Sequence, residues 1–162
     1  MPEMAAIFCA DCGTECALVD GRDVDTHDPE IADVRVWACP VCPASWAHHA
    51  AIADGPAAAP AGAETRNARE VLAERLVVPL VREGSGGIEG AMPLAIDRLT
   101  NFLAHRMGIE PEECEVARFN LDQCRQAWSE LRGVRFADVL EHAQRHRGTK
   151  RRAPASGDGV AA

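Results

Sequence analysis

The sequence has no tyrosine, and aromatic residues make up only 4% of its 162 residues. Much of the 47% hydrophobic fraction is alanine, so a core built from this chain must be small. No apolar run approaches the roughly 18 residues of a membrane-spanning helix. The N-terminus also lacks the basic segment and long apolar stretch of a signal peptide. We therefore expect a cytoplasmic protein, without membrane contact, whose cysteines are reduced.

Basic charge is scarce in the first part of the chain. Residues 1–60 carry ten acidic and two basic residues, and this imbalance accounts for the whole net charge of −8. Contacts with a phosphate backbone rest on lysine and arginine. The acidic part is therefore poorly suited to grip nucleic acid directly.

Four of the seven cysteines form two Cys-x-x-Cys pairs, Cys9 with Cys12 and Cys39 with Cys42. Two intervening residues let both sulfur atoms of a pair point out of one tight turn, and four thiolates satisfy the tetrahedral preference of Zn²⁺. Because the 26 residues between the pairs exceed the usual spacing of roughly 15–20, they must hold more than one tight hairpin. The pattern predicts one structural zinc ion held by these four cysteines.

Other residues near the pairs are alternative ligands or shield the site. Cys₃His sites exist, so a histidine can replace a cysteine, and the candidates are His27, His48 and His49. Cys16 follows the first pair closely, and we interpret it as a small buried residue. Trp37 and Trp46 are expected to shield the thiolates from water rather than to stack on bases.

Composition and periodicity divide the chain into four regions. We expect a β zinc ribbon over residues 1–52, with strands at 16–19, 34–38 and 45–48. Residues 53–63, rich in alanine, proline and glycine, read as a linker. Residues 64–147 have the apolar spacing of three or four helices, with Thr65 as the first N-cap and Pro79 kinking or ending the first helix. Residues 148–162 are expected to form a disordered basic tail, so the predicted class is α+β.

Sequence signals also mark where the later helices begin and end. Pro93 suits a first helical position, and Gly108 and Gly133 are typical stop signals. Asn120 followed by Gln123 resembles a capping box. Cys114 and Cys124 lack the spacing of a metal knuckle, and we interpret both as core residues.

The order of these motifs resembles the "zinc-finger-containing domain" family of bacterial and bacteriophage proteins. The resemblance covers roughly residues 8–132 and rests on segments 9–13, 27–33, 37–42 and 102–109 together with His49. It implies a zinc ribbon followed by a helical domain, and it implies no established activity. The chain departs from the family pattern at Glu115, where members usually carry histidine, and at residues 77–80, where they usually carry an aromatic-proline-tryptophan segment.

Two functions fit these patterns, and neither is enzymatic. Four cysteines would close the zinc site, and no His-Glu-x-x-His or other catalytic motif is present. The first function is an accessory protein of nucleic acid or its machinery, with contacts from basic residues at the end of the chain: Arg145, Arg147, Lys150, Arg151 and Arg152. The alternative is a protein-interaction adaptor that uses the acidic ribbon. The sequence leaves the partner and the oligomeric state open.

Overall fold

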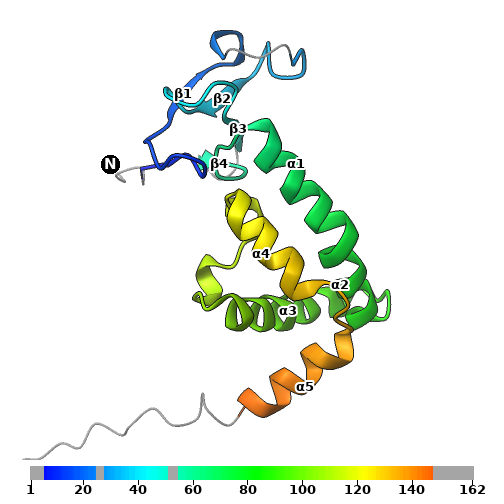
Figure 1. The fold of residues 1–162 in the computed structure, drawn as a ribbon. Helices are drawn as coiled ribbons and strands as arrows, with labels where there is room; N and C mark the ends of the chain where they lie inside the picture. Colours follow the sequence, from blue (N-terminus) through cyan, green and yellow to red (C-terminus); the bar gives the residue numbers. More distant parts are fainter. Residues whose placement is uncertain (1–5, 25–27, 51–54, 148–162) are drawn as a thin grey trace, which may run out of the picture.

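The computed structural model describes residues 6–24, 28–50 and 55–147 of the chain. Within these ranges, a small sheet lies at one end of the molecule and helices make up the rest (Figure 1). The fold class is α+β, as the sequence predicts. None of the helices in the described ranges has the length and hydropathy needed to cross a membrane.

The sheet is antiparallel, with strand order β1-β2-β3-β4. Its strands are β1 (Ala17–Asp20), β2 (Arg35–Ala38), β3 (Trp46–Ala50) and β4 (Gly55–Pro56). Gly21 follows β1 in a 3₁₀ turn, η1 (Gly21–Asp23), where a Cβ atom would lie only 1.6 Å from the carbonyl oxygen of Ile31. Only glycine fits this close approach of two backbone segments. The first three strands confirm the sequence prediction to within two residues at each end.

Residues 55–61, which have the composition of a linker, form ordered backbone contacts with the sheet. Gly55 and Pro56 form β4 against β3, and Ala61 pairs with Trp46 in an isolated bridge. The amide of Ala59 also donates to the carbonyl of Ala117, in the helical part. Small residues without long side chains let this segment pass closely between the sheet and the helices. Residues 55–61 therefore contact both parts of the protein.

One long helical segment runs away from the sheet (Figure 1). It consists of α1 (Ala63–Leu72), a π-helical segment η2 (Ala73–Val77) and α2 (Val78–Ser85). Pro79 does not end this helix. Proline lacks an amide hydrogen and its ring crowds the carbonyl four residues earlier. The wider π-helical turn just before Pro79 accommodates both effects, and the helix continues to Gly86, whose φ of 60° closes it.

The remaining helices are α3 (Met92–Met107), α4 (Leu121–Leu131) and α5 (Phe136–His146). Short 3₁₀ turns connect them: η3 (Glu89–Ala91), η4 (Pro111–Glu113) and η5 (Val116–Arg118). Pro93 lies in the first turn of α3, and Gly108 ends that helix with a φ of 69°. The Asn120–Gln123 capping box is present at the start of α4. These three sequence predictions are confirmed.

A single apolar cluster holds the helices together, with Phe119, Leu131 and Val139 among its fully buried members. Cys114 and Cys124 belong to this cluster, which confirms their interpretation as core residues. Arg69 is also buried, at 7% exposed. Its guanidinium donates to the carbonyl of Phe119 at 2.7 Å and to that of Ala59 at 2.8 Å. Arg69 thus joins α1, the segment before α4 and the ordered stretch after β4.

Candidate metal centre

The first knuckle is a tight turn that presents two sulfur atoms. The amide of Cys9 donates to the carbonyl of Thr14 at 2.9 Å, and the amide of Gly13 donates to the carbonyl of Cys9 at 2.9 Å. Gly13 has a φ of 72°, in the left-handed region that glycine adopts without strain. The Cys-x-x-Cys-Gly spacing therefore folds locally into the turn that the sequence predicts.

The second knuckle begins where β2 ends. The amides of Val41 and Cys42 point at the sulfur of Cys39, at 3.4 and 3.3 Å. Burial raises the pKa of Cys39 overall, and the two backbone donors aimed at its sulfur oppose that shift. Ala44 has a φ of 51°, so the turn out of this knuckle also uses a left-handed residue.

The two knuckles bring the four predicted cysteines together. The sulfur atoms of Cys9, Cys12, Cys39 and Cys42 all lie within 4.8 Å of one another, and those of Cys12 and Cys39 are 3.5 Å apart. A tetrahedral ion with metal–sulfur bonds of ~2.3 Å places its sulfur ligands about 3.8 Å apart. The donor set and the spacing therefore fit such an ion.

Electrostatics favour a cation at the centre of these four sulfurs. Hydrogen bonds from the side chain and backbone of Thr14 lower the pKa of Cys12 to about 6. Burial, followed by the charges of Cys39 and Cys9, raises the pKa of the adjacent Cys16 to about 12. Four thiolates this close repel one another unless a cation neutralises them. Cys16 is 6% exposed and outside the four-sulfur group, consistent with a small core residue.

The alternative ligands lie elsewhere. His49 accepts a hydrogen bond from the indole nitrogen of Trp37 at 3.2 Å, and His48 is exposed with its ring edge-on to Trp46. Neither histidine belongs to the four-sulfur group, and His27 falls outside the described residues. The expectation that Trp46 shields the thiolates is wrong, because it packs in a separate small core with Ile31 and Val36. Among the described residues, Ile7 is the large apolar residue packed against the cysteines.

Asp11, between the two cysteines of the first knuckle, connects this knuckle to helix α1. Its carboxylate accepts a hydrogen bond from the amide of Gly62 at 2.7 Å and another from the hydroxyl of Thr65 at 2.6 Å. Gly62, not Thr65, is the N-cap of α1, so the predicted cap is wrong by one turn. Thr65 is instead buried and faces the knuckle. The acidic group at this helix N-terminus comes from a distant part of the sequence, which local capping rules do not reveal.

Arg66, one residue further along α1, also reaches the ribbon. Its guanidinium donates to the carbonyl of Ala44 at 2.9 Å and lies 4.2 Å from the centre of the Trp46 ring. Burial lowers the pKa of Arg66 from its usual value, while the charges of Asp28 and Asp11 oppose that shift. Both knuckles are thus fixed to the start of α1.

The predicted basic contacts are only partly within the described residues. Arg145 forms an ion pair with Glu141 at 2.6 Å, one helical turn earlier in α5. Arg147 follows the end of α5 and lines a cavity beside α3. Lys150, Arg151 and Arg152 lie outside the described residues.

Sequence reasoning missed a second group of metal-ligand side chains, His105, His142 and His146, which the structure brings together. The spacing of four between His142 and His146 was a visible signal, but nothing local connects His105 to them. Burial, followed by the charges of His146 and His105, lowers the pKa of His142 below its ordinary value.

A small antiparallel sheet carrying two cysteine knuckles, packed on a helical part, defines a zinc-finger type of protein. The comparison with known families agrees. The model of a family described as "zinc-finger-containing domain" matches residues 5–134, and the chain belongs to this family. Searches of the curated proteins and of the solved structures found no match.

Proposed function

We propose that Cys9, Cys12, Cys39 and Cys42 hold one structural zinc ion. The observation that carries this proposal is the closed set of four sulfur atoms within 4.8 Å, tied to helix α1 through Asp11. Four thiolates complete the tetrahedral shell of zinc and leave no position for water or substrate. Such an ion stabilises the fold and does not catalyse a reaction.

The zinc proposal is tested by replacing one ligand and one neighbouring cysteine. Cys39→Ser should abolish the thiolate-to-metal charge-transfer absorption of the cobalt-loaded protein, whereas Cys16→Ala should preserve it. Zinc binding of this kind contributes on the order of 10 kcal/mol to folding. Chelation should therefore unfold residues 8–50 and leave most of the helical amide signals in the NMR spectrum unchanged. A ribbon that keeps its amide shifts after complete metal removal contradicts the proposal.

We further propose that the protein is a non-enzymatic accessory of nucleic acid or of nucleic-acid machinery. The support is a separation of charge along the molecule. Residues 1–60, the part of the sequence that contains the strands of the sheet, carry ten acidic residues and only two basic ones. Helix α5 lies at the opposite end, where Arg145 and Arg147 are found (Figure 1). In the sequence, residues 145–152 carry five basic residues and no acid. A phosphate backbone would approach this end and be repelled by the ribbon.

The contact would be electrostatic and weak at physiological salt. Five cations release about 4.5 counterions from duplex DNA, so affinity should fall on the order of 500-fold between 50 and 200 mM salt. The ion pair of Arg145 with Glu141 reduces this number, because that charge is already partly neutralised. No base readout is expected from such a contact.

A titration of the zinc-loaded chain with labelled single- and double-stranded DNA and RNA tests this function. Arg147→Gln should weaken binding and lower the salt slope by about one counterion. Arg22→Gln removes the same charge from the ribbon end and is the matched control. Binding that is absent at low salt, or equally weakened by both variants, would overturn the nucleic-acid proposal.

A protein-interaction adaptor is the second candidate, and one observation favours it. Two large apolar side chains at the knuckles are exposed on the acidic ribbon, Phe8 at 54% and Val41 at 66%. Exposed apolar residues in an acidic part of the chain suit a partner with a basic, partly apolar surface. Phe8→Ser and Val41→Ser should weaken binding to a basic amphipathic peptide while leaving nucleic-acid binding unchanged. If both variants bind the peptide as tightly as the parent chain but bind nucleic acid more weakly, the ribbon is excluded as the docking surface.

A further inference from the structure

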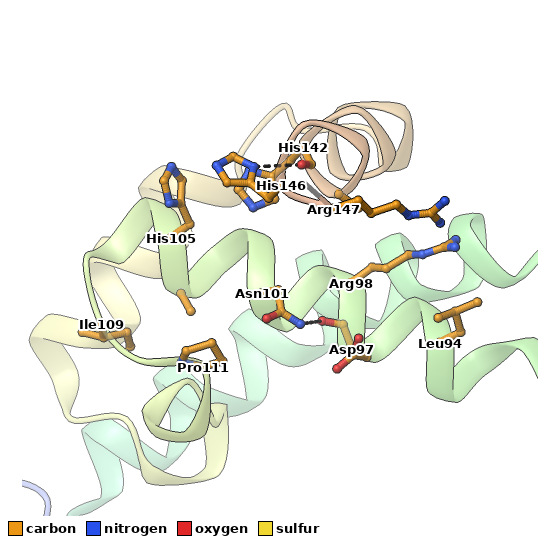
Figure 2. Close-up of a pocket in the computed structure, with 12 residues that line it drawn as sticks. Leu94, Asp97, Arg98, Asn101, His105, Ile109, Pro111, His142, His146 and Arg147 are labelled. Atoms are coloured by element: carbon orange, nitrogen blue, oxygen red, sulfur yellow. Dashed lines mark hydrogen bonds between the residues drawn. The ribbon is translucent and has the colours of Figure 1, made fainter. Parts of the chain in front are cut away.

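Three histidines from two helices meet at one end of a cavity in the helical part. His105 is in the last turn of α3, and His142 and His146 lie one turn apart on α5. Their ring centres are 4.9 Å (His105–His142), 5.0 Å (His105–His146) and 4.2 Å (His142–His146) apart. One ring nitrogen of each lies within 4.8 Å of a ring nitrogen of the other two. Figure 2 shows the three rings together, with His105 approaching from α3.

The contacts of these rings resemble those of metal ligands. The Nδ1 of His146 lies 2.9 Å from the carbonyl oxygen of His142, marked by a dashed line in Figure 2. A carbonyl oxygen only accepts, so Nδ1 carries the proton of this hydrogen bond. Ligating histidines usually donate a hydrogen bond from the N–H of their second ring nitrogen to a backbone carbonyl or carboxylate in this way. The ring of His142 is fixed edge-on against Phe102, with centres 5.5 Å apart.

The position of the cluster also favours a cation. His142 and His146 belong to the last two turns of α5, where the unpaired carbonyl groups carry partial negative charge. Four arginines near the cluster would oppose a cation. Arg98 and Arg147 line the same cavity as the histidines. Arg145 and Arg106, whose charges act on His142, are each paired with a carboxylate. Arg145 contacts Glu141 at 2.6 Å and Arg106 contacts Glu130 at 3.2 Å. Their repulsion is therefore reduced.

We propose that His105, His142 and His146 form a second metal site, which binds a divalent transition ion such as Zn²⁺ or Co²⁺. Neutral imidazole nitrogen is a preferred ligand of these ions. Tetrahedral nitrogen ligands lie about 3.4 Å apart, so we expect rotations of the exposed side chains of His105 and His146 to close the present spacing around His142. The two histidines one turn apart on α5 form the usual helical metal-binding pair.

This site differs in kind from the cysteine site. Three nitrogen ligands would leave the fourth tetrahedral position open. The three histidines line a cavity of about 680 Å³ together with residues including Asp97, Asn101 and Arg98 (Figure 2). A water molecule would complete the shell. The ion would also join α3 to the end of α5, two elements that otherwise meet through apolar packing.

The test is metal stoichiometry of the full chain, prepared without a histidine tag. We expect two zinc or cobalt ions per chain. His105→Gln should reduce the number to one and leave the thiolate-to-cobalt absorption unchanged, because that absorption arises from the cysteine site alone. His146→Gln should do the same. His105 and His146 are exposed, so the far-ultraviolet circular dichroism of both variants should match that of the parent chain.

His48→Gln is the matched control, since His48 is an exposed histidine on β3 outside both clusters. It should retain two ions. The proposal is overturned if the parent chain binds only the thiolate-coordinated ion. It is also overturned if His105→Gln keeps two ions, or if His48→Gln loses one to the same extent as His105→Gln.

Discussion

Asp11 offers the sharpest test of how the ribbon is attached to the helices. Asp11→Ala removes the acceptor of two hydrogen bonds, one from the amide of Gly62 and one from the hydroxyl of Thr65. Loss of a carboxylate at a helix start costs about 1 kcal/mol. Thr65 is 2% exposed, so leaving its hydroxyl without an acceptor costs about 1 kcal/mol more. We therefore expect the free energy of unfolding to fall by about 2 kcal/mol.

The measurement is urea unfolding of the zinc-loaded protein, followed by circular dichroism. Asp20→Ala is the control, because Asp20 is exposed and makes no side-chain capping bond to the turn that follows it. We expect a change within about 0.5 kcal/mol for this variant. Asp11→Asn should lie between the two, since an amide keeps one acceptor oxygen. If Asp11→Ala is no more destabilising than Asp20→Ala, the carboxylate does not anchor α1 to the knuckle and the reasoning fails.

Two further predictions concern the helical core. A Cβ atom on Gly84 would lie 2.3 Å from the ring of Phe136, whereas a Cβ atom on Gly90 would meet nothing within 4 Å. Gly84→Ala should therefore lower the free energy of unfolding by about 2 kcal/mol relative to Gly90→Ala. Equal stability of the two variants in thermal melts would contradict this packing. Burial raises the pKa of Cys114 to about 11 from an ordinary value of 9.0. The protonated thiol of Cys114 therefore makes its full contribution to the free energy of unfolding below pH 9, and this contribution is lost as the pH rises toward 11. Alkylation of Cys114 in the folded protein should be slow at pH 8 and should accelerate steeply up to pH 11, and a rate at pH 8 equal to that of the unfolded chain would refute the assigned burial.

Much of the local structure follows from short-range sequence signals. Each of these signals acts within a few residues: Gly13 in the first knuckle, the Asn120–Gln123 box and Gly108 at the end of α3. Alternating apolar residues likewise gave the strand β2. The composition of segment 53–63 did not predict strand β4, because a composition rich in alanine, glycine and proline is shared by flexible linkers and by ordered segments that pass close to their neighbours. Its pairing with β3 depends on that neighbour.

The sequence by itself determined the two knuckles, because a Cys-x-x-Cys turn needs no distant partner to point both sulfurs one way. Tertiary structure alone decided which distant residues meet. It placed Asp11 under the start of α1 and brought His105 on α3 beside His142 and His146 on α5. The histidine cluster arises from the packing of α3 and α5 through their apolar faces. Two of its members, His105 and His146, are exposed, so their identity contributes little to that packing. Local patterns therefore predict the cysteine centre, whereas the histidine cluster becomes visible only once the helices are in place.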